Sequence, residues 1–158
     1  MSNLEVRHVA MSDPLVLPLI EDLVREYTSR YGFLYEDLLS YPPARFAPPD
    51  GAFILLIEDG EAVAGGAFQR HDPGTAEVKR VWTHRDHRRR GLARRVMAEL
   101  EKEAAGRGYS RIYLTTGPNQ PEAVGMYLAG GYTALFDLTS PPTDGPLPFE
   151  KRLTSTDS

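Results

Sequence analysis

AEVKRVWTHRDHRRRGLARRVMA, the segment Ala76–Ala98, changes from the pattern of a strand to that of a helix. Residues 76–83 are rich in Val and contain the chain's Trp, and they alternate around charged residues, which is typical of a half-buried strand. From Leu92 onward, apolar residues recur at intervals of three and four, which predicts a helix with one buried face. A strand and a helix joined by a short, Arg-rich turn therefore form the centre of the predicted fold.

The turn between the two elements predicts a phosphate-binding site. Gly91 lies where the turn meets the helix, and a glycine there allows backbone N–H groups to converge on one point. The N-terminus of a helix also carries a partial positive charge of about half a unit. Six arginines lie between Arg85 and Arg95, and a guanidinium group can pair with phosphate through two parallel hydrogen bonds. The alternative is a solvated basic run at a helix start, which leaves the glycine and the preceding strand unexplained.

Two motifs follow each other in a defined order: residues 88–93 read RRRGLA, and residues 120–132 read QPEAVGMYLAGGY. The first resembles the Q/R-x-x-G-x-G/A loop of the GNAT-type acyl-CoA N-acyltransferases, which holds the pyrophosphate of coenzyme A. The second resembles that family's N-x-x-A-x-x-x-Y signature, followed by glycine and an aromatic residue. Gln120 stands where the family usually has Asn, so a side-chain contact there is in question. The resemblance covers nearly the whole chain and thins before Phe53.

The resemblance implies the GNAT fold, an α/β fold of the mixed α+β kind. A single domain is expected over residues 1–153, with a disordered tail at 154–158. Its sheet is mostly antiparallel, its parallel fourth and fifth strands splay apart, and about four helices cover both faces. The residue patterns predict strands at residues 4–9, 53–58, 61–70, 76–83, 111–116, 132–138 and 149–153. They predict helices at about 14–27, 33–39, 92–106 and 120–130.

The same resemblance implies acetyl-CoA as co-substrate and no metal. The pantetheine of coenzyme A is expected to fill the gap between the splayed strands and to pair with backbone groups of the fourth strand. A backbone N–H there would polarise the thioester carbonyl, as an oxyanion donor does. The residues expected to contact the cofactor are Val81, Trp82, Thr83, Arg88, Arg89, Arg90, Gly91, Leu92, Ala93, Arg94, Gln120, Ala123 and Tyr127.

Two catalytic roles are carried over from the family to matching positions. Tyr127 matches the tyrosine of the second signature and is the expected general acid, which protonates the departing thiolate. The alternative is a core tyrosine that packs on the closing strands. Glu77 precedes Arg88 by eleven residues, the spacing of the glutamate base in histone-acetylating relatives. The alternatives are a surface carboxylate paired with Lys79 or Arg80, and ordered water as the proton acceptor.

The acceptor side is predicted from weaker patterns. Tyr31, Phe33 and Tyr35 form an aromatic cluster, which fits a small satellite core. By the resemblance, the cluster instead forms the wall of the acceptor pocket, and Glu77 is expected to line the same pocket. Acidic residues that fit a cationic acceptor are Glu36, Asp37, Asp50 and Glu150. The expected reaction is direct attack of a primary amine, in a ternary complex, with a small molecule as acceptor. The alternatives are a protein or peptide amino group, and a non-catalytic sensor that binds coenzyme A.

Composition excludes several other classes of protein. The chain has 158 residues, a net charge of −4 and no cysteine. An acidic chain is a poor match for nucleic acid, and the lack of cysteine excludes disulfides, thiolate metal sites and a cysteine acyl-enzyme. His84 and His87 lack further convincing metal ligands and are expected to be solvated. With no apolar run of membrane-spanning length and no leader pattern, we expect a cytoplasmic monomer or homodimer.

Overall fold

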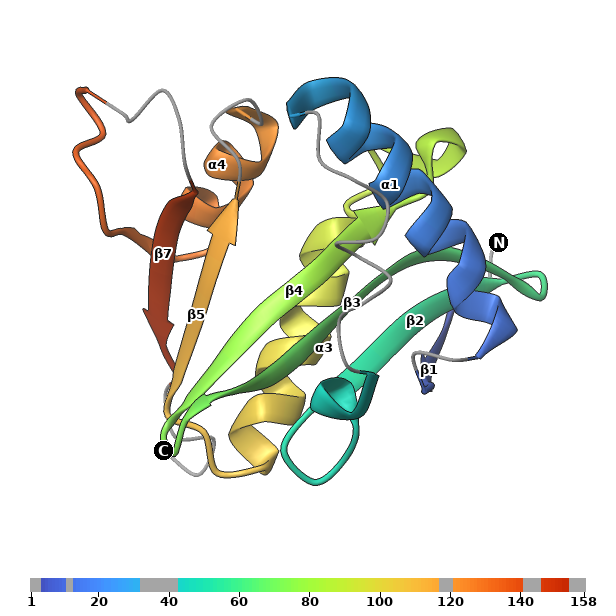
Figure 1. The fold of residues 1–158 in the computed structure, drawn as a ribbon, viewed down its shortest axis with the longest axis horizontal. Coiled ribbons are helices and arrows are strands. Elements are labelled where there is room, and N and C mark those ends of the chain that lie inside the picture. The colour runs from blue at the N-terminus through green and yellow to red at the C-terminus, as the bar shows by residue number, and fades with distance from the viewer. Residues whose placement is uncertain (1–3, 11–12, 32–42, 117–120, 141–145, 154–158) are drawn as a thin grey trace.

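The alternating segments of the sequence form one seven-stranded sheet with helices on both faces (Figure 1). The computed structural model describes residues 4–10, 13–31, 43–116, 121–140 and 146–153. The strands are β1 (Leu4–His8), β2 (Ala52–Glu58), β3 (Glu61–Asp72), β4 (Thr75–Thr83), β5 (Arg111–Thr116), β6 (Thr133–Ala134) and β7 (Leu147–Arg152). The helices are α1 (Leu17–Tyr31), α3 (Leu92–Gly106) and α4 (Pro121–Ala129).

The strand order is β1-β2-β3-β4-β5-β7-β6. All neighbouring strands are antiparallel except β4 and β5, which are parallel and are connected through α3. A parallel pair needs such a crossover connection, whereas the tight turns after Glu58 and Asp72 suffice for the antiparallel pairs. The predicted mixed α+β sheet with one parallel pair is therefore confirmed. About four helices were expected, and three lie in the described ranges, together with short 3₁₀ turns.

The parallel strands β4 and β5 pair over only part of their length. The ladder runs from Thr75 opposite Arg111 to Val78 opposite Leu114. Beyond that point β4 continues to Thr83 and β5 to Thr116 without pairing, and Figure 1 shows the two strands diverging. The predicted splay is therefore present, and it opens at the ends where α3 and α4 begin.

A β-bulge in β4 lies at the point where the splay begins. Opposite β3, the register shifts between Gly65 and Ala67, and Arg80 has a φ of 64°. An extra residue in one strand reverses the side chains that follow it. Val78 therefore packs in the cluster on the α3 side of the sheet, whereas Trp82 packs in the cluster on the α1 side. Without the bulge these two residues, four apart, would face the same side.

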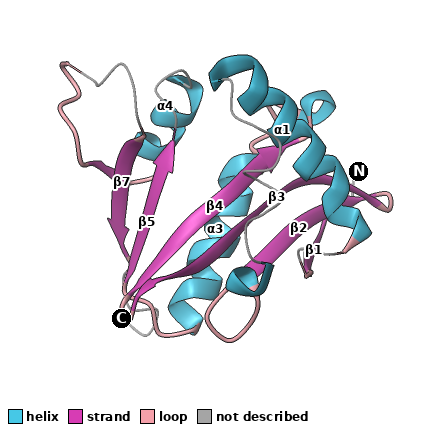
Figure 2. Cartoon of the chain, viewed as in Figure 1, coloured by secondary structure: helices cyan, strands magenta, loops and turns pink. Residues whose placement is uncertain are grey.

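Each face of the sheet carries its own apolar core, and Figure 2 shows α1 and α3 on opposite sides. On one face, α3 packs so closely that a Cβ on Gly66 would lie 2.9 Å from Val96 Cγ1. On the other face, α1 follows a 3₁₀ turn capped by Asp13, whose Oδ1 accepts from Leu15 N at 2.9 Å. Burial of these apolar faces is the main stabilising contribution to the fold. None of the helices in the described ranges is long and apolar enough to cross a membrane.

The end of the chain differs most from the predicted elements. The strand expected at 132–138 is confirmed only at Thr133–Ala134, since the residues that follow form turns held by the Asp137 side chain. The strand expected at 149–153 is β7, which begins earlier, at Leu147, and lies between β5 and β6. The helix predicted at 33–39 and the tail at 154–158 lie outside the described residues.

Candidate active site

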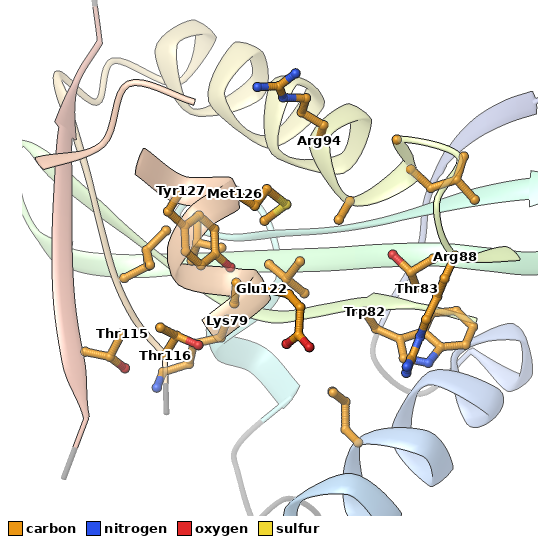
Figure 3. A pocket seen from close by; sticks show the side chains of 18 of the residues that line it. Lys79, Trp82, Thr83, Arg88, Arg94, Thr115, Thr116, Glu122, Met126 and Tyr127 are labelled. Atoms are coloured by element: carbon orange, nitrogen blue, oxygen red, sulfur yellow. The ribbon is translucent and has the colours of Figure 1, made fainter. Parts of the chain in front are cut away.

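A cavity of about 600 Å³ occupies the gap between the diverging ends of β4 and β5. Val78 and Leu114, the last pair of the ladder, form its closed end. The first turns of α3 and α4 form two of its walls, and Leu23 of α1 contributes from the other face of the sheet. Figure 3 shows polar side chains from β4, β5, α3 and α4 gathered around this space. Within the described residues, no group of three or more His, Asp or Glu side chains could hold a metal ion.

Gly91 lines the cavity. It is the N-cap of α3 and has a φ of 75°, in the left-handed region that favours glycine. A Cβ at this position would meet nothing within 4 Å. No side chain caps the helix by a hydrogen bond. The N–H groups of the first turn and the positive end of the helix dipole are therefore directed at whatever lies in front of Gly91.

The structure brings most of the predicted cofactor residues to this cavity. Those that line it are Val81, Trp82, Thr83, Arg88, Arg89, Gly91, Leu92, Ala93, Arg94, Ala123 and Tyr127. Arg90 and Glu77 do not line it, and Gln120 lies outside the described residues. Of the predicted acceptor residues, Tyr31 ends α1 and its side chain is not described, whereas Phe33 and Tyr35 lie outside the described residues.

Tyr127 lines the cavity and belongs to the core at the same time. Its side chain is buried, with 6% of its surface exposed. The ring packs against Tyr132 and Phe149, with ring centroids 5.6 Å apart in each pair. Figure 3 shows its hydroxyl pointing into the cavity. Burial and the adjacent Glu101 carboxylate raise the pKa of the neighbouring Tyr132 far above its usual value.

Comparison with known proteins identifies the family. A family model described as the acetyltransferase (GNAT) family matches residues 17–132, which include the turn at Gly91, the splayed strands and Tyr127. The chain belongs to this family. It is a GNAT N-acetyltransferase, and the sheet with its splayed strands is the GNAT fold.

Individual relatives agree with this assignment. An IAA acetyltransferase from Azospirillum brasilense is 29% identical over 133 residues, which are 84% of this chain and 86% of the relative. The solved structure of an acetyltransferase from Streptococcus agalactiae matches with a TM-score of 0.75 and 19% identity, over 95% of this chain and 98% of the other. The PaiA N-acetyltransferase of Thermoplasma acidophilum, solved in complex with coenzyme A, matches with a TM-score of 0.72 and 16% identity, over 95% and 99%.

Arg90, although within the GNAT loop motif, is directed away from the cavity. Its guanidinium donates to both carboxylate oxygens of Glu58 at the end of β2, at 3.1 and 2.7 Å. The same guanidinium lies 2.7 Å from His87 Nδ1. Glu58 is 9% exposed, and its hydrogen-bonded carboxylate raises the pKa of Arg90. Arg90 thus anchors the loop to the sheet, and the expected contact with cofactor phosphate has no support from this geometry.

Two neighbouring arginines can separate anchoring from phosphate binding. We expect Arg90→Ala to lower the melting temperature of the free protein, because it removes two hydrogen bonds to the buried Glu58 carboxylate. Arg89→Ala, which removes an exposed side chain lining the cavity, is the matched control: the free protein keeps its melting temperature, and coenzyme A stabilises it less. Thermal melts with and without coenzyme A measure both effects. A normal melting temperature combined with lost stabilisation in Arg90→Ala would instead assign Arg90 to the phosphates.

The two histidines of the loop are partly exposed, at 30% for the His84 side chain and 27% for that of His87. His84 N donates to Val63 O at 2.8 Å, and its Nδ1 accepts from Asp86 N at 3.1 Å. The rings of His84 and His87 are 5.4 Å apart in an edge-to-face arrangement. Both histidines therefore help to fix the loop that carries Arg88–Gly91.

Trp82 connects the site to α1. Its indole Nε1 donates to Asp22 Oδ2 at 3.0 Å, and Asp22 Oδ1 accepts from Arg25 at 2.7 Å. The indole is buried, with 3% exposed, and its side chain lies on the α1 face as a result of the bulge. This hydrogen bond fixes α1 over the end of β4 and places Leu23 at the edge of the cavity.

Glu77 lies on β4 before the bulge and is engaged by three neighbours. Its Oε1 accepts from Gln69 Nε2 at 3.0 Å and lies 3.7 Å from His71 Nδ1, and its Oε2 lies 3.5 Å from Lys79 Nζ. Its side chain is 15% exposed, and only Lys79 of this group lines the cavity. The placement favours the alternative of an ion pair with Lys79, and the base role of Glu77 stays a prediction.

The kinetics of Glu77→Gln decide between these interpretations. Because the carboxylate is engaged and lies off the cavity, we expect kcat to fall by less than about threefold, with ordered water as the proton acceptor. A fall of about 10²–10⁴-fold, with loss of the acidic limb of the pH–rate profile, would establish Glu77 as the base. The assay is thiol release over a range of pH, and a thermal melt checks that the variant is folded.

Several residues that line the cavity were not predicted from the sequence. They are Leu23, Val78, Lys79, Leu114, Thr115, Thr116, Glu122 and Met126. Thr115 and Thr116 end β5, so the splay itself implied their position. Met126 was implied by Ala123, because residues three or four positions apart on a helix share a face. Glu122 precedes Met126 by four positions and so lies on that face as well. Of the predicted acidic acceptor residues, Asp50 and Glu150 do not line the cavity, and Glu36 and Asp37 lie outside the described residues.

Proposed function

We propose that this GNAT enzyme transfers an acetyl group from acetyl-CoA to a primary amine of a small molecule. The amine attacks the thioester directly, in a ternary complex. One observation carries the proposal: a single cavity extends from the uncapped N-terminus of α3 to the hydroxyl of Tyr127. An extended molecule with phosphates at one end and a thioester at the other fits that arrangement.

The charges and the strand edges of the cavity support coenzyme A as the carrier. Arg88, Arg89 and Arg94 line it around Gly91, and guanidinium groups at a helix N-terminus suit phosphates. Beyond Val78, the edge of β4 forms no ladder with β5. An extended chain with amide groups, such as pantetheine, can lie along such an edge as an added strand does.

The proposed chemistry requires a proton donor and no acyl-enzyme. The nitrogen of a neutral amine forms a bond to the thioester carbon, and a backbone N–H of β4 stabilises the oxyanion. As the C–S bond breaks, the thiolate takes a proton from the Tyr127 hydroxyl. The nitrogen gives its extra proton to water, and the tyrosinate takes one back from the solvent.

A thiol-release assay with acetyl-CoA and a panel of primary amines tests the proposal. We expect release of free coenzyme A that depends on the amine, and an N-acetylated product by mass spectrometry. Stabilisation by coenzyme A without turnover of any amine would contradict the proposed reaction and would favour a binding protein. The relative from A. brasilense is described as an IAA acetyltransferase, so the panel includes acceptors that carry an indole ring.

A further inference from the structure

Among the described residues that line the cavity, Glu122 is the acidic one. The charged residues that line the cavity are otherwise Lys79, Arg88, Arg89 and Arg94. Figure 3 shows the Glu122 carboxylate pointing into the open space between α4 and β4. Within the described part of the chain, the side chain is exposed and makes no hydrogen bond or ion pair. A carboxylate directed into a basic cavity without a partner is available to a ligand.

The helix α4 places this carboxylate close to the reacting end of the proposed site. Glu122 lies in the first turn of α4 and Tyr127 five residues later. Both side chains line the cavity, together with Ala123 and Met126. An acceptor held by Glu122 and a thioester beside Tyr127 would therefore share one cavity.

Electrostatics assigns Glu122 to one of the two substrates. The phosphates of coenzyme A are negatively charged, and a carboxylate facing them would be repelled. The arginines around Gly91 suit those phosphates, whereas Glu122 suits a positive charge. A protonated amine gains a charge-assisted hydrogen bond from a carboxylate, which is stronger than a neutral one.

We infer that Glu122 binds the protonated amino group of the acceptor and so selects cationic primary amines over uncharged ones. The inference rests on the proposed acetyl transfer and names the class of acceptor for that same site. Glu122 acts on binding, and the ammonium loses its proton to water before the nitrogen attacks. A cationic acceptor is thereby held beside the thioester without any further acidic residue.

The test compares two aromatic primary amines that differ in charge. Benzylamine is a cation at neutral pH, and aniline is uncharged. With acetyl-CoA at saturation, we expect Glu122→Gln to raise the KM for benzylamine by about 10–100-fold, the effect of one charge-assisted hydrogen bond. The KM for aniline and the KM for acetyl-CoA stay unchanged. Salt raises the benzylamine KM of the wild type and has less effect on the variant, since the attraction is screened.

Glu21→Gln is the matched control. It removes the same charge from an exposed residue of α1 that precedes Leu23 by two positions and does not line the cavity, and we expect both amines to keep their KM. An unchanged benzylamine KM in Glu122→Gln would overturn the inference, as would an equal rise for both amines or a rise in the KM for acetyl-CoA. Failure of the proposed function is distinguishable, because the wild type would then release no thiol with any amine.

Discussion

A glutamate in place of Gly91 is expected to abolish the stabilisation of this protein by coenzyme A. For the wild type, ligand at 100 times its Kd contributes about 2.7 kcal/mol. For a chain of this length that raises the melting temperature by about 5–10 °C. In the variant, the new carboxylate lies at the N-cap of α3, where the proposal places the pyrophosphate. Repulsion and lost space act together there, so the melting temperature should no longer respond to the ligand.

Gly60 offers an unusually close control for this experiment. It has a φ of 81°, similar to the 75° of Gly91, and a Cβ at either position would meet nothing within 4 Å. Gly60→Glu therefore introduces the same charge and a similar backbone strain, about 1–2 kcal/mol, in the turn between β2 and β3. We expect both variants to melt earlier than the wild type when free, and only Gly60→Glu to be stabilised by coenzyme A. An unaltered response in Gly91→Glu would place the phosphates elsewhere.

The second large effect concerns Tyr127→Phe. We expect kcat to fall by about 10²-fold or more, since the thiolate then leaves without its proton donor. The KM for acetyl-CoA and the melting temperature should change little, because the ring that packs against Tyr132 and Phe149 is retained. Thiol release under saturating substrates, together with a thermal melt, measures both. Full activity in this variant would exclude Tyr127 as the acid.

Tyr132→Phe should give the opposite result. Its hydroxyl donates to Glu101 Oε2 at 2.8 Å in a buried setting. Loss of a buried hydrogen bond to a charged group costs about 1.5–3 kcal/mol, so this variant should melt earlier and keep its kcat. If Tyr127→Phe lost stability and activity in proportion, as a purely structural tyrosine would, the core interpretation of Tyr127 would hold instead.

The sequence predicted those parts of the site that are local along the chain. The turn at Gly91 and the face of α4 that carries Ala123 and Tyr127 each depend on a few consecutive residues. Both line the cavity. The splay of β4 and β5 came from the family resemblance, and the structure has it.

What was missed depends on contacts between distant residues or on one-residue irregularities. In the sequence, nothing distinguishes Arg90 from the neighbouring arginines. Its partner Glu58 lies 32 positions away, at the end of β2. The bulge at Arg80 moves the side chains that follow it to the opposite face of the sheet, and the alternation of the sequence does not predict it. Glu122 occupies a position for which the family signature specifies no residue type. Its place in the cavity therefore follows from the structure and not from the motif.

The short ladder between β4 and β5 sets stability against function in this enzyme. Extending the pairing from Val78 and Leu114 to Thr83 and Thr116 would add backbone hydrogen bonds and continuous sheet, and the apo protein would become harder to unfold. It would also remove the cavity, because the same strand edges would then be satisfied by each other. Selection for activity therefore opposes the most direct route to a more stable sheet, and engineering for heat resistance is better directed at β1, β2 and β3.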